Sequence, residues 1–377
     1  MLALEIVFWL CVALLVHTHV TYPLSLAVLA RMRVAASAPA AAERGELPHV
    51  SLIIAAHDEE AVIERRVRNA LESEYPRERL EVIVGSDGSN DRTVELAEAA
   101  GADLVLDLSR RGKVEAQNAA VERGRGAVLA FSDANSFWRP DALRRLVERF
   151  ADPAVGYVCG QATFTDERGE NLEGVYWRYE LAVRGLESRL ASVTAGNGAI
   201  YAVRREDYVA MPSDHGHDLC LPFQMVRRGR RAVYEPAARA EELLAPTASG
   251  EWERKVRMMN RTWGVLRRDR MLSPRGYSAL YAYEMFSHRT LRYASPFLHL
   301  IALGANVALV GQGWIYVVTL AAQAALLAAA ALGRVSRAWP LRIAAYYVSV
   351  TASIAAGLVD RIRSGPATTW ESVEGTR

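Results

Sequence analysis

Apolar residues gather at the two ends of the chain, whereas the middle alternates between short apolar runs and charged stretches. Residues 2–30 form one apolar run with no Asp, Glu, Lys or Arg after Glu5. This length predicts a helix that crosses a membrane. The start, MLALE, lacks the positive charge of a signal peptide, and a buried helix of a soluble protein is the alternative. Three more apolar stretches are candidate spans: 296–310, 314–332 and 341–359.

Positive charges predict the orientation of these spans. Arg31 and Arg33 directly follow the first run, and Lys and Arg residues mark the cytosolic ends of membrane helices. Arg334 and Arg337 follow the third run and fit the same side. We therefore expect a multi-pass protein of the cell (inner) membrane with its large polar region in the cytosol. The number of membrane spans near the carboxyl terminus is either two or three, because the sequence does not decide whether residues 341–359 cross the membrane.

Between the spans, the pattern predicts an α/β fold. The run 50–56 (VSLIIAA) is apolar and β-branched, as in a buried strand, and 58–73 has apolar residues at helical spacing. Repeated β-α-β spacing indicates a parallel sheet covered by helices. Ligands bind outside the carboxyl ends of such strands, so polar residues there are candidates for chemistry. The further predicted elements are strands at 80–89, 103–108 and 127–136, and helices at 91–100 and 113–123.

Composition and charge exclude several classes of protein. Charged residues make up 23% and hydrophobic residues 51%, which fits neither a disordered chain nor a simple many-span transporter. The net charge is +2 without a basic block, which argues against a nucleic-acid binder. Cys11, Cys159 and Cys220 form no CxxC pair, so buried structural roles in a reducing compartment are expected.

Two of the predicted strands end in side chains that suit phosphate and metal chemistry. Asp87 lies in SDGSND, where Gly88 permits a sharp turn that directs the carboxylate toward a base or ribose. Capping of the next helix is an equal alternative. Asp133 and Asn135 follow the run AVLAF two residues apart, and oxygen ligands suit Mg²⁺ or Mn²⁺ on a leaving diphosphate. A surface turn is the alternative there.

A third acidic position precedes a later helix. Asp218 follows His215, Gly216 and His217 and opens a predicted helix at 219–227. Its carboxylate could act as a general base that deprotonates an acceptor hydroxyl, or it could cap the helix. The two histidines are expected to be ordinary polar residues instead of metal ligands.

Six segments in order carry a resemblance to a known family: IIAAHDEE, IVGSDGSNDRT, RRGKVEAQNAA, FSDANSFWRPDALRRLV, GAIYAVRRE and HDLCLPFQMVRRGRRAVYEP. Together, across about residues 48–265, they resemble the inverting glycosyltransferases of family 2, the GT-A fold enzymes related to cellulose, chitin and hyaluronan synthases. The resemblance implies a Rossmann-like domain that binds a nucleotide sugar, flanked by transmembrane helices. It also implies attack in line, with inversion and without a covalent intermediate.

Carried over by position, the resemblance assigns roles to the polar strand ends. A basic segment from Arg254 adds two arginines that could pair with the diphosphate, with membrane contact as an equal alternative. The expected nucleotide-sugar contacts are Ala55, Glu59, Asp87, Lys113, Asp133, Arg257 and Arg261; the metal ligands are Asp133 and Asn135; the catalytic base is Asp218.

The chain departs from the family pattern at three places. Asn135 replaces a second aspartate, which weakens the expected metal site, and His217 replaces the usual acidic residue before the base. The Gln-x-x-Arg-Trp motif of processive synthases is absent; residues 260–263 read NRTW. Processive synthesis is therefore not supported.

These observations predict a membrane-bound, metal-dependent glycosyltransferase that moves a sugar from a UDP- or GDP-sugar to a lipid-linked or polysaccharide-type acceptor, with other polysaccharide-assembly proteins as partners. A non-catalytic subunit of the same fold is one alternative. A nucleotidyltransferase is another, but it would need a basic Gly-rich loop where AAHD supplies acid. The expected parts are an N-terminal transmembrane helix (1–30), a linker (31–48), the GT-A domain (49–265), a membrane-proximal segment (266–294), transmembrane helices (295–359) and a tail (360–377).

Overall fold

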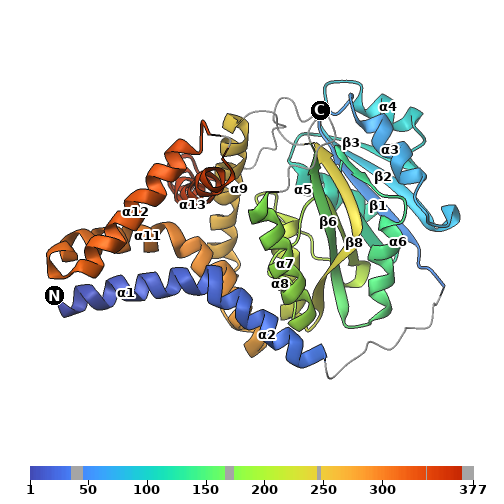
Figure 1. Ribbon diagram of the computed structural model, residues 1–377. Helices are drawn as coiled ribbons and strands as arrows, with labels where there is room; N and C mark the ends of the chain where they lie inside the picture. Colours follow the sequence, from blue (N-terminus) through green and yellow to red (C-terminus); the bar gives the residue numbers. More distant parts are fainter. Residues whose placement is uncertain (35–45, 166–173, 244–247, 337, 367–377) are drawn as a thin grey trace.

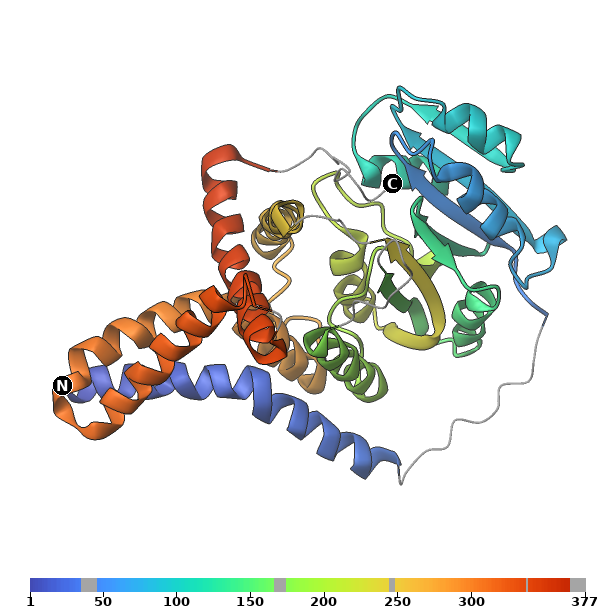
Figure 2. The same ribbon diagram turned by 45° about the horizontal axis from the view of Figure 1, so that its top comes forward.

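The computed structural model describes residues 1–34, 46–165, 174–243, 248–336 and 338–366. An α/β part lies beside long helices, and α1, α11 and α12 project away from it in both views (Figure 1, Figure 2). Residues 35–45 of the predicted linker, Arg337, and residues 367–377 of the predicted tail lie outside the described residues.

The described residues form one eight-stranded sheet in the order β3-β2-β1-β4-β7-β6-β8-β5. The four strands β3, β2, β1 and β4 are parallel, which confirms the predicted repeat. Beyond β4 the sheet is mixed, because β7 runs antiparallel to both β4 and β6. The strands are β1 Val50–Ala56, β2 Leu80–Asp87, β3 Leu104–Leu108, β4 Val128–Asp133, β5 Ser136–Trp138, β6 Val155–Thr165, β7 Ile200–Arg204 and β8 Arg231–Leu243.

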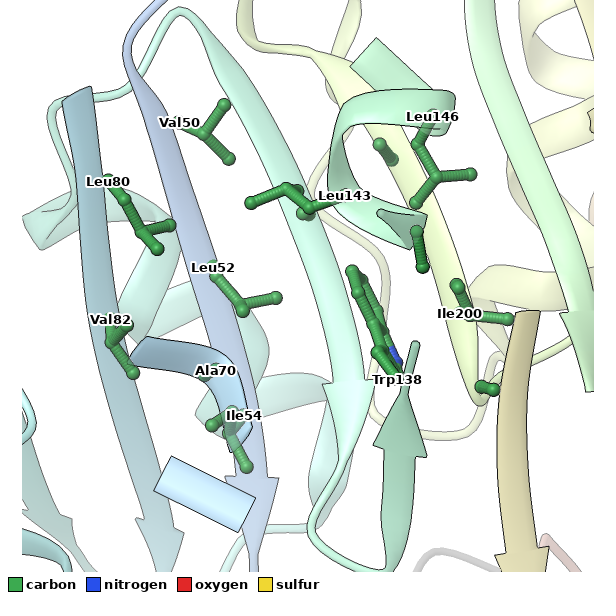
Figure 3. Packing of buried hydrophobic residues seen from close by; sticks show 14 of the residues in the cluster. Val50, Leu52, Ile54, Ala70, Leu80, Val82, Trp138, Leu143, Leu146 and Ile200 are labelled. Atoms are coloured by element: carbon green, nitrogen blue, oxygen red, sulfur yellow. The ribbon is translucent and has the colours of Figure 1, made fainter. Parts of the chain in front are cut away.

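Helices cover both faces of this sheet. Alternate strand residues point to opposite faces, so Leu52 and Ile54 of β1 pack in one apolar core and Ile53 in the other. Figure 3 shows the first core, where Trp138 and Leu143 lie against the strands. The helices of the α/β part are α3 Ile63–Leu71, α4 Thr93–Ala99, α5 Lys113–Arg123, α6 Ala142–Glu148, α7 Val175–Leu190 and α8 His217–Arg227.

The predicted helix at 58–73 is wrong in its first part, because α3 begins only at Ile63. The preceding backbone is held by the neighbouring loop instead. The amide of Asp58 donates to Ser89 Oγ at 3.1 Å and the amide of Glu59 to Thr93 Oγ1 at 2.7 Å. These side-chain acceptors compete with the helical carbonyls for the same amides.

Four helical segments of the described chain are long and apolar enough to cross a membrane: Leu2–Met32, Ala279–Gln312, Trp314–Leu332 and Trp339–Ser364. The second is longer than the predicted stretch at 296–310. The elements are α1 Leu2–Val16, a π-helical turn at His17–Thr21, α2 Tyr22–Val34, α10 Ala279–Glu284, a second π-helical turn at Met285–Thr290, α11 Leu291–Leu309, α12 Trp314–Leu332 and α13 Trp339–Ser364.

A further long helix, α9 Ala248–Arg268, connects the sheet to these segments. It packs closely on α13: a Cβ atom at Gly357 would lie 2.5 Å from Met259 Cβ. The indole nitrogen of Trp263 donates to the Ile354 carbonyl at 2.9 Å. Helix α9, which carries the basic segment from Arg254, and the last helix, α13, therefore pack together as one unit.

Candidate active site

The carboxyl ends of β1, β2 and β4 meet at one edge of the sheet. Ala55 of β1 pairs with Gly85 of β2 on one side and with Asp133 of β4 on the other. The side chain of Ala55 is fully buried and packs inside the protein at this edge. Parallel pairing thus places the loops after these three strands side by side.

The loops after β1 and β2 are joined by hydrogen bonds. Asp58 accepts from the Asn90 amide at 2.7 Å, and Asp91 accepts from the Glu60 amide at 3.0 Å. Asp91 also accepts from the Thr93 amide at 3.0 Å and so caps α4. A hollow of about 380 Å³ lies between these loops, lined by Asp58, Glu60, Ala61, Asn90 and Asp91. Glu59, predicted to contact the nucleotide, is buried beside this hollow.

Asp87 does not cap α4; it holds the loop before α5. Its carboxylate accepts from the Arg111 amide at 2.7 Å and from the Gly112 amide at 2.9 Å. Gly88 has φ +63°, and a Cβ atom there would lie 2.8 Å from the Arg110 nitrogen, so this tight approach requires glycine. Asp87 therefore fixes the backbone of the loop that leads directly to Lys113.

Lys113 and Asp133 form an ion pair at the centre of the edge, with 19% and 18% of their side chains exposed. Arg66 of α3, which the sequence analysis missed, is fully buried nearby and donates to Ser132 Oγ at 3.1 Å. Burial lowers the pKa of Arg66 to about 9, and the Asp133 carboxylate opposes this shift. Asp133 is therefore influenced by two cations. Asn135 is half-buried in the turn between β4 and β5.

Asp218 is the second residue of α8, and its carbonyl accepts from the Gly196 amide at 2.7 Å. The N-cap position of α8 is Gly216, and no side-chain hydrogen bond of this residue caps the helix in the described structure. His217 is buried, and its ring nitrogens lie 2.8 and 3.4 Å from the hydroxyls of Tyr201 and Tyr208. Burial, and secondarily Lys113, lowers the pKa of His217 to about 3, so this ring is a neutral core residue.

Arg261 of α9 connects the basic helix to the Asp218 turn. Burial and the neighbouring Arg257 lower the pKa of Arg261, while the carboxylates of Asp218 and Asp214 oppose the shift. Arg257 and Arg261 are one helical turn apart and so share a face of α9. Arg261 is thus close enough to the predicted base for the two charges to interact, and Arg257 lies beside Arg261.

A second network that the sequence analysis missed ties the Asp218 turn to α9 and α13. His215 lies between two carboxylates: Nδ1 is 2.8 Å from Asp214 and Nε2 is 2.5 Å from Asp269. Arg268 of α9 donates to Asp214 at 2.9 Å, and Arg361 of α13 lies 3.6 Å from it. His215 therefore connects the Asp218 turn to Asp269, at the end of α9.

The segment Ala195–Gly198 runs between the two groups of predicted residues, and all of its residues are half-buried. A Cβ atom at Gly198 would lie 3.7 Å from Lys113 Nζ and 4.0 Å from Asp133 Oδ2. Gly196, at the other end, donates to the Asp218 carbonyl. The ion pair and the base-bearing turn are thus adjacent to opposite ends of one short segment.

Comparison with known proteins identifies the family of the domain that carries these residues. Residues 51–228 match the family model described as Glycosyl transferase family 2. The poly-beta-1,6-N-acetyl-D-glucosamine synthase of Staphylococcus aureus (strain COL) is 26% identical over 242 residues, which cover 59% of this chain and 57% of that protein. The N-acetylglucosaminyltransferase of Rhizobium meliloti (strain 1021) is 26% identical over 288 residues, covering 70% of this chain and 63% of that protein. The chain thus spans less than two thirds of either relative.

The fold has a solved counterpart. The mannosyltransferase PcManGT from Pyrobaculum calidifontis, in complex with GDP-Man and Mn²⁺, superposes with a TM-score of 0.74 at 22% identity. The match covers 95% of this chain and 99% of that chain, so it includes the long apolar helices as well as the sheet. The predicted fold and the predicted resemblance are both confirmed. Residues 51–228 form a glycosyl transferase family 2 domain with a GT-A fold, joined to helices long and apolar enough to cross a membrane.

Proposed function

We propose that this chain is a membrane-bound inverting glycosyltransferase that moves a sugar from a nucleotide diphosphate sugar to a lipid-linked or polysaccharide-type acceptor. One observation carries the proposal: the Lys113–Asp133 pair and Asp218 lie next to Gly198 and Gly196, at opposite ends of one segment. The two glycines are two residues apart, so their backbones lie within about 7 Å of each other. A leaving diphosphate beside Gly198 and an acceptor beside Gly196 would then be neighbours, as direct displacement with inversion requires.

The donor would lie along the edge formed by β1, β2 and β4. We assign the nucleotide to the neighbourhood of Ala55, Glu59 and Asp87, because their loops are adjacent to the Lys113–Asp133 pair. Lys113 would then exchange its contact with Asp133 for one with the diphosphate. Support comes from PcManGT, which binds GDP-Man with the same fold. The identity of the sugar and of the nucleotide is outside this proposal.

A divalent cation, Mg²⁺ or Mn²⁺, fits the residues at the end of β4. The Asp133 carboxylate and the Asn135 amide supply oxygen ligands, which such cations prefer. A Cβ atom at Gly198 would lie 4.0 Å from Asp133 Oδ2, so the carboxylate is close to the proposed diphosphate position. When bound, the cation would offset the charge that develops on the leaving diphosphate. We therefore propose Asp133 and Asn135 as its protein ligands.

Asp218 would serve as the general base. It lies on the Gly196 side of the segment, away from the ion pair, where an acceptor hydroxyl would approach the sugar. Its carboxylate would accept the hydroxyl proton as the bond to the sugar forms. The turn is held by His215 and Asp269, which would keep the carboxylate in a constant position. Arg257 and Arg261 would pair with phosphate oxygens from the α9 side.

The membrane arrangement is part of the same proposal. The four candidate spans agree with a multi-pass protein, and Arg31, Arg33 and Arg334 would place residues 49–265 in the cytosol of the cell (inner) membrane. Nucleotide sugars are available on that side. The expected boundaries of the domain and the flanking segments belong to this proposal as well.

The test is donor hydrolysis and transfer by the purified full chain with a panel of UDP- and GDP-sugars, with and without Mn²⁺. We expect metal-dependent turnover of one donor, lost in Asp133→Ala. Turnover of nucleoside triphosphates with a sugar phosphate, without donor hydrolysis, would favour a nucleotidyltransferase. Donor binding without any turnover across the panel would favour a non-catalytic subunit.

A further inference from the structure

The backbone at Gly196 is surrounded by polar groups that the proposed reaction does not use. A Cβ atom at Gly196 would lie 1.9 Å from the Tyr157 hydroxyl oxygen, so only glycine fits beside this phenol. The guanidinium of Arg184, from α7, donates through Nη2 to the Gly196 carbonyl at 3.2 Å. Both side chains therefore converge on the residue whose amide holds the Asp218 turn.

Each of these two side chains has a buried polar atom without a hydrogen-bond partner among the described residues: the Tyr157 hydroxyl and Arg184 Nη1. Tyr157 is fully buried and Arg184 is 9% exposed. No carboxylate of the described residues forms an ion pair with Arg184. Glu187, one turn further along α7, is bonded to His288 and Tyr22. A buried cation without a counter-ion is strongly unfavourable. Because the described residues supply no counter-ion, the arrangement suits an incoming anion.

The chemistry of the two groups defines that anion. A guanidinium offers only hydrogen-bond donors, and its planar shape matches phosphate oxygens. Burial raises the pKa of Tyr157 well above its ordinary value, so the phenol remains a proton donor. The guanidinium carbon lies over the rings of Trp177 and Tyr234, 6.0 and 5.7 Å from their centroids. Two converging donors favour a phosphate over a neutral sugar hydroxyl.

The helix that carries Arg184 also contacts the first candidate span. Val183 and Leu190 of α7 pack in one buried cluster with Tyr22 and Leu26 of α2. Figure 1 shows α2 passing beneath the α/β part next to α7. Arg184 is therefore close to where a lipid-borne group would reach the site from the membrane.

We propose that Arg184 and Tyr157 bind a phosphate group of a lipid-linked acceptor, on the Gly196 side of the Asp218 turn. This inference rests on the proposed glycosyltransferase function and specifies its acceptor class. The phosphate would be held on the Gly196 side of the segment, whereas the Lys113–Asp133 pair lies next to Gly198. The acceptor hydroxyl would thereby be directed toward Asp218.

The experiment measures binding of the full chain, held in solution by an amphipathic polymer in place of detergent, to phosphatidylcholine vesicles. The vesicles contain either a polyprenyl phosphate or the matching uncharged polyprenol, with free inorganic phosphate as a competitor. We expect preference for the phosphate vesicles, with at least about a tenfold loss of affinity in Arg184→Gln, because this variant loses a charge-assisted hydrogen bond to the phosphate. Tyr157→Phe removes a single oxygen atom and should weaken binding several-fold. Arg189→Gln, an exposed arginine on the same helix, is the matched control and should bind like wild type.

Three outcomes would overturn this inference: equal binding to the two vesicle types, unchanged binding in folded Arg184→Gln and Tyr157→Phe, or inorganic phosphate binding as tightly as the lipid. Donor hydrolysis by the wild-type chain separates this failure from that of the proposed function. Hydrolysis without phosphate selectivity would reject only the acceptor site. Absence of hydrolysis with every donor would reject the transferase assignment itself.

Discussion

Replacing Lys113 by methionine should tighten the binding of Mn²⁺ in the absence of nucleotide. The ammonium of Lys113 is paired with the Asp133 carboxylate, and about four-fifths of each side chain is buried, with 19% and 18% exposed. An incoming cation must break this charge-assisted hydrogen bond, which contributes about 1.5–3 kcal/mol. Because 1.4 kcal/mol corresponds to a factor of ten, the affinity should rise about ten- to a hundredfold. Arg66 still acts on Asp133, so we expect the lower half of this range.

The same variant should transfer sugar more slowly, because Lys113 would no longer contact the diphosphate. Loss of one such electrostatic contact typically costs about 10²–10³ in rate. If the reasoning is right, the affinity for Mn²⁺ rises while the transfer rate falls. Unfolding of the variant would instead lower both, so the two measurements together distinguish a specific effect from loss of the fold. Calorimetric titration with MnCl₂ gives the first quantity and a transfer assay the second. Lys255→Met is the control, because Lys255 is the only other lysine and lies over the Tyr346 ring. Folded Lys113→Met with unchanged or weaker Mn²⁺ affinity would refute the competition at Asp133.

Three further outcomes are expected. Asp218→Asn should bind donor normally and transfer about 10²–10⁴-fold more slowly; normal transfer would leave the base unidentified. Asn135→Asp should keep or tighten Mn²⁺ binding in the same titration, and loss of binding would give Asn135 another role. A single cysteine in place of the exposed Glu122 should react with a membrane-impermeant reagent in inverted vesicles but not in intact cells. The three native cysteines are buried and should give little background, and labelling in intact cells would reverse the proposed orientation.

The parts of the fold that depend on local pattern could be predicted from the sequence. The strand at 50–56 and the helix at 113–123 have the predicted bounds, since β-branched residues fill the first and Gly112 and Gly124 flank the second. The 58–73 helix was misplaced because its first amides bond to Ser89 and Thr93, about thirty residues away. The pattern within one segment contains no information about such distant acceptors.

The candidate site was predictable where a chemical motif coincides with a strand end. Asp133 stands out for this reason, and Asp218 stands out because it opens a predicted helix directly after His215, Gly216 and His217. Arg66 and Arg184 are two of many arginines in ordinary amphipathic helices, and only the fold shows that each is buried beside the site. The sequence predicts either a helix cap or a ligand contact for Asp87. Its carboxylate instead accepts a hydrogen bond from the amide of Gly112, which lies in a loop 25 residues further along the chain.

Hydrogen bonds, ion pairs and apolar packing connect the candidate site to the candidate membrane helices. Asp214 is contacted by Arg268 of α9 and by Arg361 of α13, and His215 connects the same turn to Asp269. On the other side, α7 carries Arg184 toward Gly196 while its opposite face packs on α2. The proposed base and the proposed phosphate site are therefore each positioned by a helix that a membrane would hold. Arg184 contacts Gly196, and the Gly196 amide donates to the Asp218 carbonyl, so a displacement of either membrane segment would change the distance between acceptor and base. We therefore expect that the domain needs its flanking helices to transfer sugar to the proposed lipid-linked acceptor.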